Sequence, residues 1–463
     1  MNKNNIMPFH LFHHQGQHYV INIEKMSTGT VDARTSEALA MMASDQETLL
    51  PSDIEENLKK LGLVSEGWQN SQRLVKKGPY SIVNMALLLT QSCNLKCVYC
   101  YGDGGEYGTG GSMEEKTAFQ AVDWLIEQSG KMKKIHLGFF GGEPFLNFPL
   151  MKAVVEYAEK KVREMGKEVG FSATTNGTLL DDEKIAFIKK HQFDIGISID
   201  GPRAVHDAQR PYANGKGSYD SIVPKIKKLL EVMPDTLGHA VTVGNTDPQL
   251  VKDALIEIGF KKISLRQASP SLFNRDSDKI KSKRDISGLL NVLEQEAETW
   301  IHLTQSRDRQ ALETLKDKSD LFNGITALLQ NSRIYHACSA GLGMVGVSAA
   351  GDVYLCHRFV GMDNYKIGSI FEHELNRGKY LISPTTSNEK CAACFAKYYC
   401  AGGCKHDNVG SCGSFTTPSE EICHLRCREL ELAASIIGRL DPVDHAFLLE
   451  NQIFPPKPCL LDF

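Results

Sequence analysis

Three cysteines, Cys93, Cys97 and Cys100, lie in the short segment Cys-Asn-Leu-Lys-Cys-Val-Tyr-Cys. Three thiols cannot all pair with one another, and thiolate is the usual ligand of iron–sulfur clusters. A zinc site is the alternative, but zinc sites normally take four ligands arranged in two pairs. Three thiolates on a cluster of four irons leave one iron without a protein ligand, so a small molecule can bind there. The segment therefore predicts an iron–sulfur cluster with an open iron.

The pattern Cys93-x3-Cys97-x2-Cys100, with Tyr99 directly before the third cysteine, resembles the signature of the radical S-adenosylmethionine enzymes. In that family the open iron binds the amino and carboxylate groups of S-adenosylmethionine. An electron from the reduced [4Fe-4S] cluster cleaves the sulfonium to methionine and a 5′-deoxyadenosyl radical, which takes a hydrogen atom from the substrate. The resemblance implies the same cofactors here, and it implies that Tyr99 presents backbone groups to the adenine.

A Gly-Gly-Glu element follows the second apolar strand predicted in this region. Glycine has no Cβ and therefore lets the backbone approach a ligand closely. In the radical S-adenosylmethionine family this element binds the amino group of the methionine moiety, and the resemblance assigns that role to Gly141, Gly142 and Glu143. A tight turn before Pro144 is the alternative.

Three further residues are expected to contact S-adenosylmethionine. Ser198 matches a position that contacts the ribose or the carboxylate in related enzymes. Asn176 can reach a ribose hydroxyl, and Arg210 can pair with a carboxylate. Each of the three can also be ordinary loop structure. Asp200 is less favoured as a ligand residue, because an aspartate before Gly-Pro is a common turn former.

Ten of the thirteen cysteines lie beyond Tyr335. The spacing of seven of them resembles the SPASM extension, which binds two auxiliary [4Fe-4S] clusters in a subset of radical enzymes. By that family's interleaved assignment, an outer cluster is held by Cys391, Cys394, Cys400 and Cys423. An inner cluster is held by Cys338, Cys356 and Cys404.

The inner cluster is one ligand short, because four thiolates satisfy a cluster. Sulfatase maturases complete it with an additional upstream cysteine, whereas residues 333–337 contain no thiol. This difference favours an open iron that binds a substrate thiolate, as is thought for thioether-forming peptide maturases. Cys412, Cys427 or Cys459 can instead close the cluster, and Cys427 can replace Cys423. Free thiols are the alternative for each of them.

His357 and Arg358 directly follow Cys356. Sulfatase maturases carry a proposed basic aspartate after that cysteine, so His357 weakens a formylglycine-forming activity. A histidine at this place can act as a base near neutral pH, and packing against the cluster is the alternative. We predict that His357 and Arg358 are the catalytic residues.

The composition is that of an ordinary globular chain of 463 residues, long enough for two or three domains. Its 52 basic and 56 acidic residues give a net charge of −4, which suggests neither nucleic acid nor a membrane surface as a partner. We find no signal peptide and no apolar stretch of membrane-spanning length. An odd number of clustered cysteines favours metal ligation over disulfides, and we expect a cytoplasmic protein.

Strands and helices alternate from Ser81 to about Gln267, which predicts a parallel α/β sheet. Six strands are expected, at 82–89, 135–139, 169–174, 194–199, 239–243 and 261–265. Ser112 and Glu115 form a capping-box pattern for the first helix. The cysteine segment and the Gly-Gly-Glu element each follow a strand, and in barrels of parallel strands the active site lies at the carboxyl ends. The fold class is therefore α/β, with a partial (β/α)6 barrel as the radical core.

Residues 1–77 form a separate block of three short strands followed by helices. This order resembles the winged-helix-like recognition element of peptide-modifying enzymes, in which the leader of a precursor adds as a strand to the sheet edge; a structural cap is the alternative. The remaining predicted parts are the radical core at 78–284, a helical connector at 285–335, the SPASM iron–sulfur domain at 336–430 and a tail at 431–463.

Together these resemblances imply a maturase that installs thioether crosslinks, from a Cys sulfur to a carbon, in a ribosomally synthesised precursor peptide. Its cofactors are S-adenosylmethionine and three [4Fe-4S] clusters, and its partners are the precursor and a reductant such as flavodoxin or ferredoxin. A sulfatase-type formylglycine-forming maturase, a carbon–carbon crosslinking maturase and a non-catalytic iron–sulfur electron carrier are the alternatives.

Overall fold

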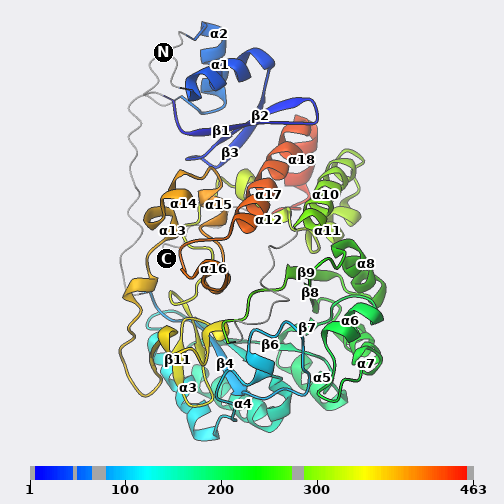
Figure 1. Ribbon diagram of the computed structural model, residues 1–463, viewed down its shortest axis with the longest axis vertical. Coiled ribbons are helices and arrows are strands. Elements are labelled where there is room, and N and C mark those ends of the chain that lie inside the picture. The colour runs from blue at the N-terminus through cyan, green and yellow to red at the C-terminus, as the bar shows by residue number, and fades with distance from the viewer. Residues whose placement is uncertain (1–5, 45–49, 65–79, 274–285, 456–463) are drawn as a thin grey trace.

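The computed structural model describes residues 6–44, 50–64, 80–273 and 286–455. Figure 1 shows a small N-terminal unit at one end of the molecule, a large sheet with its helices at the other, and C-terminal helices between them. The predicted boundaries at residues 77 and 284, and Cys459, lie outside the described residues.

The N-terminal unit is a three-stranded antiparallel meander followed by two helices. Its strands are β1 (Phe9–His14), β2 (Gln17–Asn22) and β3 (Ser27–Val31), and its helices are α1 (Ala33–Ala43) and α2 (Ser52–Lys60). The strand order is β1-β2-β3, so β2 is central. Strand β2 is buried on both faces, with Val20 packed against Leu39 and Leu58 of the helices and Ile21 in the hydrophobic cluster of the C-terminal helices. These are the three strands and the two helices that the sequence predicted.

The large sheet has nine strands, in the order β12-β11-β10-β4-β5-β6-β7-β8-β9. Six adjacent parallel strands are those predicted: β4 (Asn84–Thr90), β5 (Lys134–Gly141), β6 (Glu168–Thr175), β7 (Asp194–Ser198), β8 (Leu237–Thr242) and β9 (Lys262–Gln267). Because each neighbouring pair from β4 to β9 is parallel, the carboxyl ends of all six lie at one edge. The predicted α/β class and parallel core are confirmed.

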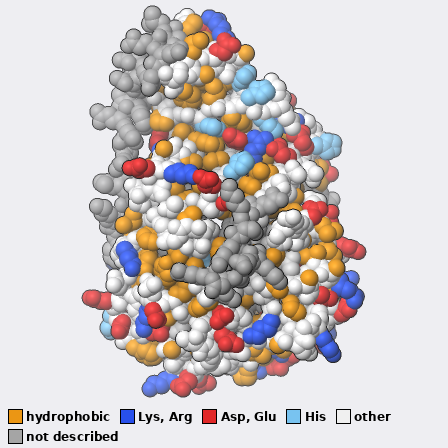
Figure 2. Space-filling view, viewed as in Figure 1, with side chains coloured by type: hydrophobic (Ala, Val, Ile, Leu, Met, Phe, Trp, Pro, Cys, Tyr) orange, Lys and Arg blue, Asp and Glu red, His pale blue; other side chains and the backbone are white. Residues whose placement is uncertain are grey.

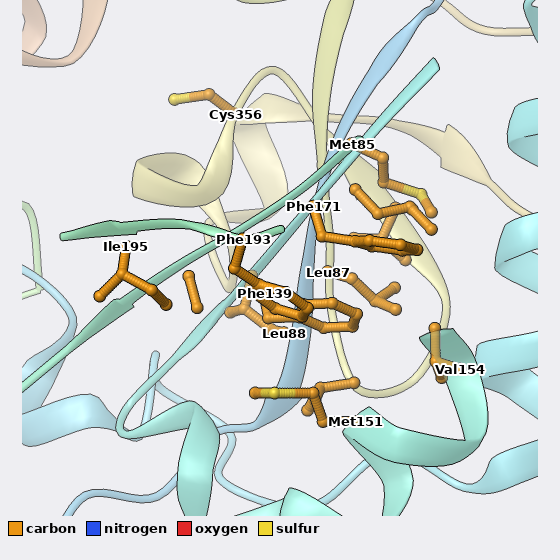
Figure 3. Close-up of a cluster of buried hydrophobic side chains, with 14 of the residues drawn as sticks. Met85, Leu87, Leu88, Phe139, Met151, Val154, Phe171, Phe193, Ile195 and Cys356 are labelled. Carbon is orange, nitrogen blue, oxygen red and sulfur yellow. The ribbon is translucent and has the colours of Figure 1, made fainter. Parts of the chain in front are cut away.

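Helices cover one face of these strands (Figure 1). They are α3 (Glu115–Gln128), α4 (Phe148–Glu164), α5 (Asp182–Lys190), α6 (Arg203–Gln209), α7 (Tyr219–Val232) and α8 (Pro248–Ile258). Figure 3 shows the core beneath them, where the rings of Phe139, Phe171 and Phe193 stack with centroids 5.4–6.2 Å apart. The predicted capping box is wrong. Helix α3 begins after Glu114, and the Ser112 hydroxyl lies 3.3 Å from Thr90 Oγ1 instead.

The C-terminal region continues the same sheet before it forms helices. Its three short strands are β10 (Met344–Val347), β11 (Asp352–Tyr354) and β12 (Lys366–Ser369). Strand β10 pairs in parallel with β4, so residues from the predicted SPASM domain share a sheet with the radical core. The longer helices are α10 (Ser287–Gln305), α11 (Arg309–Lys316), α12 (Phe322–Leu329), α16 (Lys405–Cys412), α17 (Glu420–Arg439) and α18 (Pro442–Glu450). The predicted boundary at residue 430 falls inside α17.

The N-terminal sheet packs on α17 through an apolar cluster that includes Ile21 and Met26, and through polar contacts. His10 Nε2 lies 3.0 Å from Glu431 Oε1, and Arg428 of α17 contacts His14 Nδ1 at 3.0 Å. Figure 2 shows histidine, basic and acidic side chains gathered on the upper part of this face. Glu24 also accepts a hydrogen bond from Tyr398 Oη at 2.9 Å. The N-terminal unit is therefore joined to the cysteine-rich region by specific side-chain contacts.

Candidate active site

One cavity of about 970 Å³ lies at the carboxyl ends of the parallel strands. It is lined on one side by strand ends such as Gly141, Thr175 and Ser198, and on the other by residues of α12 and α17. The lining includes cysteines from all three predicted clusters. They are Cys93, Cys97, Cys100, Cys338, Cys400 and Cys404. The cavity therefore connects the cysteine loop of the barrel with the C-terminal cysteines.

The cysteine loop leaves β4 and is fixed by backbone hydrogen bonds to a distant segment. Lys96 N donates to Pro211 O at 2.8 Å, and Val98 N donates to Gln209 O at 2.9 Å. Cys93, Cys97 and Cys100 are free thiols of intermediate exposure that all line the cavity. The structure thus brings the three predicted ligands together at the barrel mouth.

These thiols have the environment of metal ligands. Burial, together with the neighbouring thiols, raises the pKa of Cys93 to about 11 and that of Cys97 to about 12. Thiolates that are costly to form alone are stabilised by a bound cation. N–H groups also point at the sulfurs: Leu95 N lies 3.4 Å from Cys93 Sγ, and Arg210 Nη1 lies 3.9 Å from Cys97 Sγ. Such donors are typical of iron–sulfur ligation.

The two glycines of the Gly-Gly-Glu element let β5 end against this loop. Gly141 has a φ of +130°, and a Cβ there would lie 2.1 Å from Thr90 O. A Cβ on Gly142 would lie 2.0 Å from Ser92 O. Both glycines line the cavity, so a side chain at either position would displace the cysteine loop from β5.

Glu143 lies behind Gly141 and Gly142 and does not line the cavity itself. It is 1% exposed. Its carboxylate accepts hydrogen bonds from Thr175 Oγ1 at 2.7 Å and from Asn176 N at 2.8 Å. Burial raises its pKa to about 7. The side chain thus holds the end of β6 in place, while the backbone of Gly141 and Gly142 faces the cavity.

Asn176 and Ser198 line the cavity as expected. The Asn176 amide is already engaged, because its Nδ2 donates to Asn94 Oδ1 at 2.9 Å and lies 3.8 Å from Cys93 Sγ. Its Oδ1 accepts from the Thr178 hydroxyl at 2.6 Å. Asn176 is therefore placed to orient the cysteine loop, whereas Ser198, at the end of β7, presents its side chain next to the same space.

Tyr99, Asp200 and Arg210 form a buried network beside Cys97. Asp200 is fully buried and accepts from Tyr99 Oη at 2.6 Å, Arg210 Nε at 2.8 Å and Val241 N at 2.9 Å. The guanidinium of Arg210 lies 5.2 Å from the centroid of the Tyr99 ring. Sequence reasoning treated Asp200 as a turn former and missed this role. The Asp-Gly-Pro segment at a strand end was the available signal.

The three cysteines of the predicted inner group also lie together. Burial, together with the charges of Cys404 and Cys338, raises the pKa of Cys356 to about 12. Cys356 is 6% exposed and sits above the sheet core (Figure 3), whereas Cys338 and Cys404 line the cavity. Lys405 Nζ closes one side by donating to Ala340 O at 2.8 Å. Two thiols of this group thus face the space that also reaches Cys93.

Arg358 connects the inner group to the barrel loop. Its Nη1 lies 3.5 Å from Cys404 Sγ and 2.9 Å from Asp407 Oδ1, and its guanidinium lies 4.8 Å from the Tyr101 ring centroid. Burial, with the charge of Arg358, lowers the pKa of His357 to about 3, so its imidazole is neutral and a poor base at neutral pH. Asp407, which also lines the cavity, was missed because no motif marks it.

The four predicted outer cysteines form a second group, with a fifth thiol beside it. The charges of Cys400, Cys423 and Cys394 all raise the pKa of Cys391, after burial. Cys427 Sγ lies 3.9 Å from Cys394 Sγ. Cys412 is exposed. The structure therefore places Cys427 next to Cys394. Neither Cys412 nor a cysteine of the inner group takes that place.

These donor sets fit iron–sulfur clusters better than single ions. In the described part of the chain, no three His, Cys, Asp or Glu side chains converge closely enough to bind one metal ion. Four thiolates on one zinc would have sulfurs about 3.8 Å apart, from the Zn–S distance. A cluster takes one thiolate on each iron and so needs a wider set. This spacing disfavours the zinc alternative.

Residues 87–255 match the family model of the radical SAM superfamily. An uncharacterized protein of Methanocaldococcus jannaschii is 32% identical over 191 residues, which cover 40% of this chain and 63% of that protein. A cysteine-type anaerobic sulfatase-maturating enzyme of Clostridium novyi is 26% identical over 335 residues, which cover 69% of this chain and 86% of that enzyme.

Two groups of solved structures share the fold. One is anSMEcpe with bound AdoMet and a Kp18Cys peptide, which is 20% identical with a TM-score of 0.64 and covers 78% of this chain and 99% of that one. The other is Streptococcus suis SuiB bound to its precursor peptide SuiA, at 16% identity and a TM-score of 0.51, which covers 91% and 99%. No described helix is long and apolar enough to cross a membrane. The chain thus contains a radical SAM domain at residues 87–255, with its cysteine loop at the carboxyl ends of the parallel strands. The cofactors of that family are S-adenosylmethionine and a [4Fe-4S] cluster.

Proposed function

We propose that the enzyme is a maturase that joins a Cys sulfur to a carbon within a ribosomally synthesised precursor peptide. The observation that carries this proposal is the single cavity lined both by Cys93, Cys97 and Cys100 and by Cys338 and Cys404. A substrate in it can have a carbon near the first set of thiols and a sulfur near the second. Two reacting groups held in one enclosed space need no diffusive encounter.

The cluster assignment belongs to the same proposal. Cys93, Cys97 and Cys100 would hold the cluster that, with S-adenosylmethionine bound, supplies the hydrogen-abstracting radical. Cys338, Cys356 and Cys404 would hold an inner auxiliary cluster with one open position toward the cavity, and Arg358 donates to one of these sulfurs. An outer auxiliary cluster would be held by Cys391, Cys394, Cys400 and Cys423.

The proposed reaction balances as a two-electron oxidation of the peptide. One hydrogen atom leaves the acceptor carbon and ends in 5′-deoxyadenosine, and the substrate thiol loses a proton. The new S–C bond leaves one surplus electron, which the auxiliary clusters accept. One electron from a reductant such as flavodoxin or ferredoxin is consumed in cleaving each S-adenosylmethionine. Arg210 and Arg358 hold their parts of the cavity wall through their ion pairs with Asp200 and Asp407.

The N-terminal unit is proposed to bind the leader of the precursor. Strand β3 pairs with β2 on one side, and its other edge has no strand partner among the described residues. An extended peptide can add to such an edge through backbone hydrogen bonds. Because the reaction needs a strong reductant and reduced thiols, we propose that it takes place in the cytoplasm.

A sulfatase-type activity that forms formylglycine is the second candidate. It is favoured by the similarity to the sulfatase-maturating enzyme of Clostridium novyi over most of that enzyme's length. The chain differs at the position after Cys356, where it has His357, and a neutral imidazole does not replace a basic carboxylate there. Asp407 lines the cavity near Arg358 and is the available carboxylate for that alternative.

The test is anaerobic turnover of reconstituted full-length protein with dithionite, S-adenosylmethionine and the short Cys-containing peptides encoded beside its gene. We expect 5′-deoxyadenosine and a peptide that has lost two hydrogens and no longer reacts with a thiol reagent. Loss of two hydrogens with a free thiol would indicate a carbon–carbon crosslink, and an aldehyde would indicate formylglycine. Absence of 5′-deoxyadenosine in wild type would leave only the electron carrier.

A further inference from the structure

The charged side chains of the cavity are paired with one exception. Six cations line it, and five have a carboxylate partner. The pairs are Arg210–Asp200, Lys252–Glu296, Arg266–Asp320, Arg358–Asp407 and Arg426–Glu429. The ammonium of Lys318 has no carboxylate and no hydrogen-bond acceptor in the structure as described. The cavity wall thus carries one positive charge that no side chain of the described residues neutralises.

The backbone around Lys318 is held firmly. This residue lies between α11 and α12, where Ile263 N of β9 donates to Asp317 O at 3.3 Å. On its other side Ser319 Oγ donates to Glu296 Oε2 at 2.8 Å, and Trp300 Nε1 donates to Ser319 Oγ at 2.9 Å. Lys318 is therefore presented from a fixed segment, at the side of the cavity nearest β9 and the connector helices.

The surroundings of Lys318 disfavour an isolated charge. Partial burial and then the nearby Lys252 ammonium lower the pKa of Lys318. The same wall contains the apolar side chains of Ile263, Leu265 and Val292. The carboxylate of Glu296 is not available to Lys318, because it already binds Lys252 and Ser319. An anion placed here would gain a charge-assisted hydrogen bond and would relieve the repulsion between the two lysines.

We propose that Lys318 binds a side-chain carboxylate of the peptide, so that the segment modified by the enzyme carries an Asp or a Glu. This rests on the proposed function, because the cavity must be the one that holds the peptide. The carboxylate of S-adenosylmethionine is a separate anion, expected at the cysteine loop of the barrel. The apolar wall accommodates the methylene groups of an acidic side chain, and Lys318 fixes its end.

The experiment compares two synthetic fluorescent peptides, acetyl-Gly-Cys-Gly-Glu-Gly-amide and the same peptide with Gln in place of Glu. Their binding to the reconstituted full chain with S-adenosylmethionine is followed by fluorescence anisotropy under anaerobic conditions. We expect wild type to bind the Glu peptide roughly tenfold more tightly, as one hydrogen bond to a charged group provides. The preference should shrink as salt is added, because screening weakens it.

Lys318→Gln should abolish the preference, Lys318→Arg should keep most of it and Lys318→Glu should reverse it. Lys316→Gln is the matched control, since Lys316 lies two residues away and pairs with Glu313 outside the cavity. Equal binding of the two peptides by wild type, or a preference that survives in Lys318→Gln, would overturn the proposal.

Formation of 5′-deoxyadenosine is measured on the same variants. If Lys318→Gln raises the concentration of S-adenosylmethionine needed for cleavage, Lys318 holds that cofactor and the proposal is wrong. If wild type cleaves no S-adenosylmethionine, the proposed function fails by itself, and the peptide preference still reports on Lys318. The two failures are therefore distinguishable.

Discussion

The barrel group of three thiols and the inner group of three thiols both reach the cavity, the first through all three cysteines and the second through Cys338 and Cys404, and each has the same kinds of polar neighbour. In each group an arginine contacts one cysteine sulfur, one aspartate and one tyrosine ring. Arg210 does so beside Cys97, and Arg358 does so beside Cys404. The two tyrosines, Tyr99 and Tyr101, come from the same loop of the barrel. The arrangement couples the position of both groups to one short segment.

The outer group differs in thiol number and in surroundings. Of its four thiols, Cys400 alone lines the cavity that the structure describes. The ring of Phe395, next to Cys394, stacks on His10 of the N-terminal sheet at 3.5 Å between centroids. A set of four thiols of which three lie outside the cavity suits electron transfer, whereas a set of three that includes cavity-lining cysteines leaves room for a reactant. Under the proposed function we therefore expect reaction at the first two groups and not at the third.

The largest effect is expected from removing a thiol of the barrel group. Cys97→Ala should reduce 5′-deoxyadenosine formation by more than about 100-fold. Losing a hydrogen-bond partner of a metal ligand already costs up to about 100-fold, and losing the ligand itself should cost more. Cys391→Ala, in the outer group, should lower iron content but retain cleavage of S-adenosylmethionine. Chromatographic quantitation of 5′-deoxyadenosine checks both variants. Equal losses would remove the distinction between the groups.

The inner group should separate cleavage from product. Cys404→Ala is expected to form 5′-deoxyadenosine at a rate within about tenfold of wild type, because the barrel thiols remain intact. The crosslinked peptide should disappear, since a thiol facing the cavity is lost. Mass spectrometry of the peptide, beside the 5′-deoxyadenosine yield, measures the ratio. A variant that still makes the crosslink would contradict the role given to the inner group.

The two arginines should differ in their contribution to stability. Arg210→Met leaves Asp200, whose side chain is 0% exposed, without its ion pair, and such a loss costs about 3–5 kcal/mol. Arg358→Met leaves Asp407, whose side chain is 21% exposed, so water replaces part of the interaction and the cost is about 1 kcal/mol. Urea unfolding of the metal-free proteins gives both values. A larger loss of stability for Arg358→Met than for Arg210→Met would contradict this expectation, because burial would then not decide which arginine contributes more.

Glu143 makes the stability of the barrel end depend on pH. Its pKa is about 7 in the folded chain and near 4.5 when unfolded, so the folded state binds the proton more tightly between these values. The free energy of unfolding should therefore fall, by roughly 3 kcal/mol at most, as pH rises from 4.5 through 7. Glu143→Gln removes this dependence. The difference in melting temperature between this variant and wild type should grow from pH 5 to pH 8, while Glu156→Gln, on the exposed face of α4, leaves the slope unchanged.

The strands of the barrel and the cysteine loop were predictable because their signals are local. Each strand is a short apolar run, and the spacing of Cys93, Cys97 and Cys100 by itself predicts a loop that binds an iron–sulfur cluster. Because active-site loops follow the carboxyl ends of parallel strands, these signals also predict that the loop lies beside Gly141 and Gly142. What remained hidden are interactions between residues far apart in sequence.

Asp200 is an example of a residue whose interactions the sequence alone does not predict. Locally it is a turn residue, yet its carboxylate joins Tyr99, 101 residues earlier, to Arg210 and Val241. Lys318 lies two residues from Lys316 in a polar helical stretch, and only the tertiary pairing of the other cavity cations distinguishes it. The parallel pairing of β10 with β4 joins the two predicted domains in one sheet, and no periodicity in either segment indicates it.

Replacing Cys427 should give the smallest effect. It tests whether the outer group of four thiols, unlike the two groups of three, leaves no iron without a cysteine ligand. Four irons already bound by four thiolates have no place for a fifth, so Cys427→Ala should keep the iron content of wild type, whereas Cys400→Ala should not. A thiolate bound to iron has no proton, so in the contact of 3.9 Å Cys427 donates and Cys394 accepts. Losing that donor should lower the reduction potential of the outer cluster slightly, and Cys427→Ser should restore it, as EPR-monitored titration can measure. Iron loss in Cys427→Ala equal to that in Cys400→Ala would instead make Cys427 a ligand, and the outer group would then have an exchangeable position as well.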